Sequence, residues 1–125
     1  MSKRVLVVDD EPDIRAVIQG CLEDIAGWEV LTANSGEQGL QIAGTQELDG
    51  ILMDVSMPGM GGLEALQKLQ ENASTETIPV ALLTAKALTE EREQFASLTI
   101  VGLIVKPFDP MTLVEQVASV FGWES

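Results

Sequence analysis

Residues 5–27 read VLVVDDEPDIRAVIQGCLEDIAG and contain one complete unit of strand, loop and helix. The first four residues are an uninterrupted apolar run, which is typical of a strand that is buried on both faces. Two adjacent acids follow, and Pro12 then stands in the first turn of a helix. Apolar residues recur at helical spacing up to Gly27, where the helix is predicted to end, and they are Ile14, Val17, Ile18, Cys21, Leu22 and Ile25.

The same unit occurs five times along the chain. Further apolar runs lie at residues 30–33, 51–53, 80–83 and 103–105, separated by polar or glycine-bearing loops and helical stripes. Strands that alternate with helices over short connections are typical of a parallel sheet covered on both faces. The sequence therefore predicts an α/β fold with five βα units, a doubly wound parallel five-stranded sheet, and one domain over residues 1–125.

Capping residues mark the ends of two of the later helices. Ser35 is predicted to be the N-cap of the second helix, with Gln38 as its capping-box partner. The fifth helix is predicted to open at Asp109, with Pro110 at its first position, and to end at Gly122. The apolar positions of these two helices are Leu40, Ala43, Leu113, Val117 and Phe121.

The third and fourth helices are predicted from apolar spacing. The fourth begins near Thr89, where Glu90 and Glu91 are favourable at the positive end of the helix dipole. The residues expected to be buried are Leu63, Leu66 and Leu69 in the third helix and Phe95 and Leu98 in the fourth.

The charge of the chain restricts its partners. The 125 residues include 20 acids and 7 bases, a formal net charge of −13, and 46% of the residues are hydrophobic. This hydrophobic content supports a folded core. Binding to phosphate backbones requires Lys and Arg, so neither nucleic acid nor an anionic membrane is expected as a partner.

The chain contains no histidine, which excludes Ser-His-Asp and Cys-His catalysis, histidine metal sites and a phosphohistidine within these residues. The single cysteine, Cys21, cannot form an internal disulfide and favours a cytoplasmic location. The N-terminus lacks the pattern of a signal peptide, and the longest uncharged stretch, residues 94–105, is shorter than the ~20 residues that span a bilayer.

Polar side chains stand directly after the predicted strands. Asp9 and Asp10 follow the first strand, and Asp54, Thr84 and Lys106 follow the third, fourth and fifth. The carboxyl ends of parallel strands meet at one edge of the sheet, where open α/β folds bind ligands. Carboxylates brought together repel unless a cation lies between them, and a site of oxygen ligands alone favours Mg²⁺. A lysine beside such an ion suits an anionic oxygen.

These residues together resemble the receiver domain of two-component response regulators. The resemblance covers the whole chain and rests on an ordered set of motifs, which are Asp9-Asp10, Asp54, Met57-Pro58-Gly59-Met60, Thr84-Ala85 and Lys106-Pro107-Phe108. It implies the strand order 2-1-3-4-5 and a stand-alone phosphoacceptor signalling protein rather than an enzyme. The implied partners are a histidine kinase or histidine phosphotransfer protein, which supplies the phosphoryl group, and a downstream protein target.

The resemblance also implies a role for each matching residue. Asp54 is the implied phosphoacceptor. The implied Mg²⁺ ligands are Asp9, Asp10, Asp54 and the backbone carbonyl of Ser56, with Asp10 as a direct ligand.

Thr84 is implied to turn its hydroxyl toward the phosphoryl group, and Lys106 to form a salt bridge with it. The Lys106-Pro107 bond is implied to be cis. Two features depart from the family pattern. Leu103 occupies a position that is often aromatic, which alters the expected output coupling, and residues 59–62 replace the usual acidic residue before the third helix.

Two other functions are alternatives for the same residues. A Mg²⁺-dependent phosphohydrolase or nuclease could use the acidic cluster. However, haloacid-type phosphatases carry a second Asp two residues after the nucleophile, and this chain has Ser56 there. A scaffold that acts without phosphorylation is the third hypothesis. Taken singly, Asp54, Thr84 and Lys106 suit ordinary positions at strand ends, so only their ordered combination favours the receiver.

Overall fold

The computed structural model describes residues 3–55, 62–84, 100–106 and 108–123. The elements in these ranges are β1 (Arg4–Val8), α1 (Pro12–Asp24), β2 (Glu29–Ala33), α2 (Gly36–Thr45), β3 (Gly50–Asp54), α3 (Gly62–Glu71), β4 (Val80–Thr84), β5 (Gly102–Val105) and α5 (Leu113–Phe121). All five predicted strands are present, each longer by one residue at one or both ends. The predicted fourth helix lies outside the described residues.

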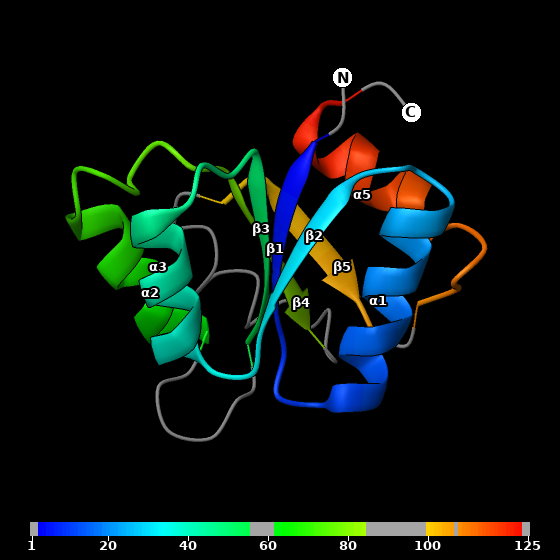
Figure 1. The fold of residues 1–125 in the computed structure, drawn as a ribbon, viewed down its shortest axis with the longest axis horizontal. Helices are drawn as coiled ribbons and strands as arrows, with labels where there is room; N and C mark the ends of the chain where they lie inside the picture. The colour runs from blue at the N-terminus through cyan, green and yellow to red at the C-terminus, as the bar shows by residue number, and fades with distance from the viewer. Residues whose placement is uncertain (1–2, 56–61, 85–99, 107, 124–125) are drawn as a thin grey trace.

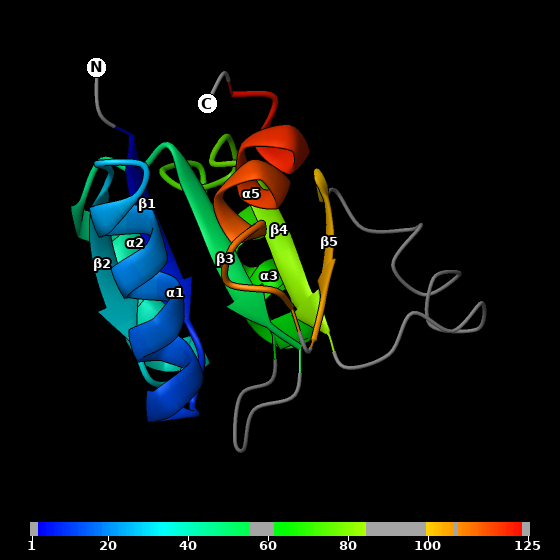
Figure 2. The ribbon, with the colours of Figure 1, turned by 90° about the vertical axis from the view of Figure 1, so that its right-hand side faces the viewer.

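The five strands form one sheet in the order β2-β1-β3-β4-β5, and all neighbouring strands are parallel. This confirms the predicted order. In Figure 1 the sheet is seen between two helical layers, with α2 and α3 on its left and α1 and α5 on its right. Figure 2 shows the strands side by side from β2 to β5, with α1 and α5 in front.

The alternation of side chains along the central strands creates two hydrophobic cores. Val5 and Val7 of β1 pack in the core beneath α1 and α5, whereas Leu6 and Val8 pack beneath α2 and α3. Strands β3 and β4 are buried along their whole length, as expected for strands covered on both faces. No helix within the described ranges has both the length and the apolar character needed to cross a membrane.

The predicted helix ends are partly confirmed. Gly27 and Gly122 adopt positive φ values of 72° and 74° beyond α1 and α5, a conformation that favours glycine. Ser35 is the N-cap of α2, and its hydroxyl accepts a hydrogen bond from the Gln38 backbone N–H at 3.1 Å. The Gln38 side chain accepts from the N–H of Asn34 at 2.7 Å, one residue before the partner expected in a capping box.

The predicted start of the fifth helix is wrong, because α5 begins at Leu113 and has Thr112 as its N-cap. Residues 109–112 form a turn instead. The Asp109 carboxylate accepts from the N–H of Met111 at 2.9 Å, and the Asp109 carbonyl accepts from the N–H of Thr112 at 3.0 Å. Asp-Pro suits the first two positions of a turn as well as the start of a helix, so the local signal is shared.

Helix α2 lies close to β1 at Gly39. A Cβ atom added to Gly39 would lie 2.9 Å from Cγ2 of Val8, whereas one added to Gly44 on the same helix would meet nothing within 4 Å. The absence of a side chain at Gly39 therefore lets the helix rest directly on the strand that leads to Asp9.

Aromatic residues pack together at the amino end of the sheet. The rings of Trp28 and Trp123 meet edge to face at 5.2 Å, and Phe121 stacks on Trp123 at 4.6 Å. The Lys3 ammonium lies 5.2 Å from the centre of the Trp123 ring. These contacts join the start of β1, the turn before β2 and the end of α5.

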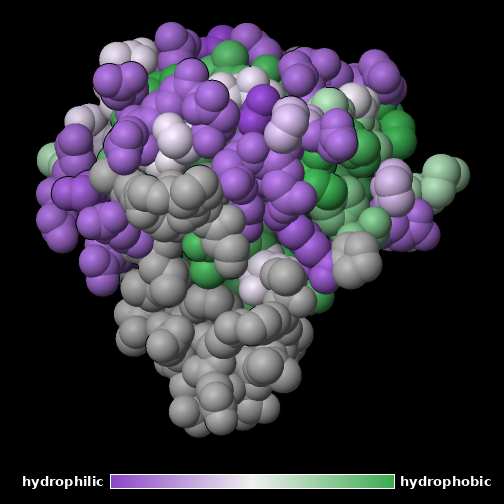
Figure 3. Space-filling view, turned by 90° about the horizontal axis from the view of Figure 1, so that it is seen from below, coloured by the Kyte–Doolittle hydropathy of each residue, from purple (hydrophilic) through white to green (hydrophobic). Residues whose placement is uncertain are grey.

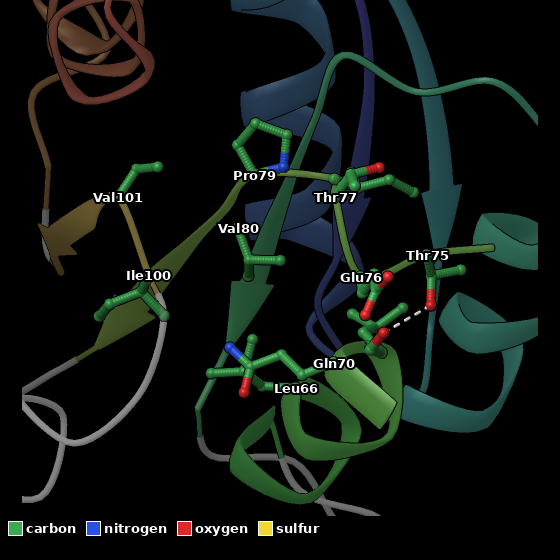
Figure 4. Close-up of a pocket in the computed structure, with 11 residues that line it drawn as sticks. Leu66, Gln70, Thr75, Glu76, Thr77, Pro79, Val80, Ile100 and Val101 are labelled. Atoms are coloured by element: carbon green, nitrogen blue, oxygen red, sulfur yellow. Dashed lines mark hydrogen bonds between the residues drawn. The ribbon is translucent and has the colours of Figure 1, made fainter. Parts of the chain in front are cut away.

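A cavity of about 250 Å³ lies at the amino ends of β4 and β5, beside the end of α3 (Figure 4). Its apolar lining includes Leu66, Val80 and Ile100. The Thr75 hydroxyl donates a 2.6 Å hydrogen bond to the Leu69 carbonyl at one side of the cavity. No strand-end acid lines the cavity, so it is separate from the site at the carboxyl edge.

Candidate functional site

Four acidic side chains converge at the carboxyl edge of the sheet. Strands β1 and β3 are neighbours, and their register pairs Val8 with Met53, so the next residues, Asp9 and Asp54, stand side by side. One carboxylate oxygen from each of Asp9, Asp10, Glu11 and Asp54 lies within 4.8 Å of the others. Figure 3 looks onto this end of the molecule, and the described surface seen there is mostly hydrophilic.

Asp9 and Asp54 are the buried members of this cluster. Asp9 is fully buried, and Asp54 is 3% exposed at the end of β3. One oxygen of the Asp9 carboxylate accepts from the Glu11 backbone N–H at 2.9 Å, at the start of α1. The Arg15 guanidinium donates to the Asp9 backbone carbonyl at 2.8 Å, which fixes the other side of the same residue. Asp10 is half-buried.

Lys106 brings an ammonium group into contact with the acidic cluster. Its ammonium nitrogen lies 2.9 Å from Asp9 Oδ2, 3.3 Å from Asp54 Oδ2 and 3.5 Å from Glu11 Oε1. Burial lowers the pKa of Lys106, but the hydrogen bond to Asp9 and the charges of Asp54 and Asp9 outweigh this effect, so the pKa lies above its ordinary value of 10.5. The ammonium therefore stays protonated at neutral pH.

Thr84 stands at the same edge, as the last residue of β4, which lies between the strands that lead to Asp54 and Lys106. It is 4% exposed, and its carbonyl accepts from the Lys106 backbone N–H at 2.7 Å. Two implied features, the Ser56 carbonyl and the Lys106-Pro107 bond, lie outside the described residues.

Leu103 lies two strands from Asp54, on β5. It is half-buried and packs against the core beneath α2 and α3. It also lines a shallow hollow together with residues of α5, among them Gln116 and Val120. The Leu103 side chain thus belongs to the α2 and α3 face of the sheet, whereas the neighbouring Gly102 faces Val120 of α5.

Glu11 is the member of the cluster that sequence reasoning missed. It directly precedes Pro12 at the N-terminus of α1, where an acid is expected simply because it complements the helix dipole. Its proximity to Asp9-Asp10 was the available signal. Its contact with Lys106, 95 residues away in sequence, becomes visible only in the folded chain.

The donor set suits a small hard cation. All four acidic side chains offer oxygen, the ligand type preferred by Mg²⁺, and their spacing lets one ion contact several of them. Lys106 lies against two of the same carboxylates, so an anion bound to the ion would also meet an ammonium.

Comparison with known proteins points in the same direction. A family model described as the response regulator receiver domain matches residues 5–118. Chemotaxis protein CheY-3 of Vibrio cholerae is 30% identical over 120 residues, which cover 96% of this chain and 92% of that protein. The crystallised chemotaxis regulator CheY4 of Vibrio cholerae has a TM-score of 0.89 and 33% identity, covering 96% of this chain and 99% of that one.

One further structural neighbour holds a metal. The receiver domain of sensor histidine kinase PA1611 from Pseudomonas aeruginosa has a magnesium ion coordinated in its active site cleft. Its TM-score is 0.85 at 28% identity, covering 98% of this chain and 99% of that chain. The chain spans about half the length of other curated relatives that it matches, 51% of one and 52% of another.

Proposed function

Because the chain belongs to the response regulator receiver domain family, we propose that it is a two-component response regulator that accepts a phosphoryl group on Asp54. The observation that carries this proposal is the 3.3 Å contact between the Lys106 ammonium and the buried Asp54 carboxylate. A nucleophilic carboxylate and a fixed cation are thereby held together beside three further acids.

The reaction is a transfer between two molecules. An Asp54 carboxylate oxygen attacks phosphorus in line with the bond to the donor nitrogen, and an acyl phosphate forms. The phosphorus–nitrogen bond breaks, and its electron pair goes to the imidazole of the donor histidine. The chain has no histidine of its own, so we assign the phosphohistidine to a histidine kinase or histidine phosphotransfer protein.

Mg²⁺ is the cofactor proposed for this step. Asp9, Asp10 and Asp54 would hold the ion, with the Ser56 carbonyl as the fourth protein ligand carried over from the family. When bound, the ion neutralises charge between the acceptor carboxylate and the phosphoryl oxygens. The chain's own contribution is to fix Asp9 between the Glu11 N–H and Arg15, so that its carboxylate needs little reorganisation.

Lys106 and Thr84 would respond to the new phosphoryl group. Lys106 already lies at the acceptor and would form a salt bridge with a phosphoryl oxygen. The Thr84 hydroxyl would turn toward the same group, favouring one of two conformations that exist beforehand. A downstream protein target in the cytoplasm would then recognise the surface that includes β5, where Leu103 replaces the usual aromatic residue.

The test is phosphorylation by a small phosphodonor. The purified chain is incubated with acetyl phosphate and Mg²⁺, and the intact mass is measured. We expect one added phosphoryl group that is labile in base, its complete absence in Asp54→Asn, and its retention in Asp13→Asn, which removes an exposed acid from α1. Phosphorylation of Asp54→Asn at the wild-type level would overturn the assignment of the acceptor.

A turnover assay with phosphate esters addresses the phosphohydrolase alternative, for which the family comparisons give no support. A phosphoacceptor takes up one phosphate per chain and turns it over slowly. Many turnovers on phosphate esters would instead indicate that the chain is a hydrolase that uses Asp54 as its nucleophile.

A further inference from the structure

Glu11 differs from the other acids of the site in its exposure. The side chain of Glu11 is 59% exposed, whereas the Asp9 side chain is fully buried and that of Asp54 is 4% exposed. Its carboxylate oxygen nevertheless lies within 4.8 Å of oxygens from the other three acids. Asp10 is half-buried, so Glu11 is the exposed member of the cluster and forms its solvent-facing side.

The contacts of Lys106 show what Glu11 does before a donor arrives. A lysine ammonium has three N–H donors, and here three carboxylates surround it, at 2.9, 3.3 and 3.5 Å. A phosphoryl group on Asp54 needs one of these donors. The contact with Glu11 is the longest and the most exposed, so it is the one released at the lowest cost.

We propose that Glu11 is a specificity-determining residue of the phosphoacceptor site, which repels phosphodonors according to their negative charge and holds Lys106 until the phosphoryl group arrives. This inference rests on the proposed function of Asp54. In this proposal the charge of Glu11 affects which donor reacts, in addition to its favourable interaction with the dipole of α1.

Small donors of different charge provide the probe. Acetyl phosphate is a dianion near neutral pH, and phosphoramidate carries a net single negative charge. A carboxylate a few ångströms from the approaching phosphorus repels the dianion about twice as strongly as the monoanion, and salt screens both effects.

The experiment measures phosphorylation rates of wild type, Glu11→Gln, Glu11→Lys and the matched control Asp13→Asn at saturating Mg²⁺. At low ionic strength, we expect Glu11→Gln to react roughly fivefold faster with acetyl phosphate and roughly twofold faster with phosphoramidate. Glu11→Lys should enlarge both factors. High salt should reduce them, and Asp13→Asn should change either rate by less than about twofold.

A binding measurement gives a readout that is independent of the reaction. Calorimetric titration with Mg²⁺ alone should show affinity lowered roughly three- to tenfold in Glu11→Gln and unchanged in Asp13→Asn, because only Glu11 lies within the cluster. Equal rate factors for the two donors, or a Glu11→Gln rate equal to wild type, would overturn the inference on Glu11 alone. Failure of the wild-type chain to become phosphorylated would instead overturn the proposed function.

Discussion

Lys106 connects three strands at the carboxyl edge of the sheet. Its backbone N–H donates to Thr84 at the end of β4, and its ammonium contacts Asp9 after β1 and Asp54 at the end of β3. The ammonium offsets part of the repulsion between these two carboxylates and so stabilises the fold as well as the site. Its contribution to the fold can be tested by pH.

The pKa of Lys106 is higher in the folded chain than its ordinary value of 10.5. The folded state therefore binds this proton more tightly than the unfolded state, and the resulting stabilisation is complete below pH 10.5 and lost as pH rises through the folded pKa. We expect the free energy of unfolding of the Mg²⁺-free chain to fall in that range. Lys106→Met should lack this component of the fall.

Denaturant titrations at increasing pH, followed by circular dichroism, check this expectation. Lys68→Met, which removes an exposed lysine of α3, is the matched control and should keep the wild-type pH dependence. Parallel curves for wild type and Lys106→Met would show that the ammonium does not contribute through its proton.

Most of the site could be predicted because parallel strands present their last residues at one edge. That rule places Asp9, Asp54, Thr84 and Lys106 together without any knowledge of side-chain conformation. Glu11 could not be predicted in the same way. Its function depends on a side-chain contact across the fold, and its local position favours an ordinary helix-terminal acid.

Helix α2 offers a test of packing against the strand that carries the site. Gly39→Ala places a methyl group 2.9 Å from Val8, whose buried, β-branched side chain has little freedom to move. We expect the free energy of unfolding to fall by about 1–3 kcal/mol. Urea denaturation measures the change.

Gly44→Ala is the matched control on the same helix. Nothing lies within 4 Å of the added atom, so the gain in helix propensity should stabilise the chain by about 0.5 kcal/mol. In a Val8→Ala background the cost of Gly39→Ala should shrink, since the two side chains would no longer overlap. Equal effects of the two glycine substitutions would contradict the close approach at Gly39.

The helix ends show where local signals are sufficient. Gly27 and Ser35 were predicted correctly because each satisfies backbone groups within its own neighbourhood. The helix start at Asp109 was predicted wrongly. The Asp109 carboxylate accepts from the N–H two residues ahead in a turn, and the Asp109-Pro110 pair suits a helix start equally well. The choice between turn and helix depends on how α5 packs onto the sheet, which the local sequence does not contain.

The whole chain carries a formal net charge of −13, and four of its acids lie in one cluster. Mg²⁺ that binds only the folded state should stabilise it, by about 2.7 kcal/mol at a hundredfold excess over the dissociation constant. For a domain of this size the midpoint of thermal unfolding should rise by roughly 10 °C. Calorimetry measures this rise.

Two controls separate binding from general screening of charge. Sodium chloride at matched ionic strength should give a smaller rise, and a chelator should reverse the effect of Mg²⁺. Asp54→Asn should lose most of the rise in the unfolding midpoint that is specific to Mg²⁺. An equal rise with sodium would mean that the cluster holds no specific ion.

The fold as a whole was predictable from the five apolar runs, because a sheet buried on both faces leaves a simple pattern in the sequence. Strand order was not contained in that pattern. The apolar runs at 30–33 and 51–53 would look the same in the sequence whether these strands lay on either side of β1 or next to each other. The strand order was therefore predicted from the family resemblance. The pairing of β1 with both β2 and β3 confirms it.

The edge-to-face pair of Trp28 and Trp123 has a practical consequence. These are the two tryptophans of the chain, and both lie at the amino end of the sheet, whereas the acidic cluster lies at the carboxyl end. Their emission and their coupled near-ultraviolet dichroism thus report whether the turn before β2 is closed against the end of α5. We expect unfolding to shift the tryptophan emission and to remove the near-ultraviolet dichroism of the pair, and we expect a phosphoryl group at Asp54 to leave both unchanged. Unfolding could then be followed in the same cuvette without interference from the chemistry.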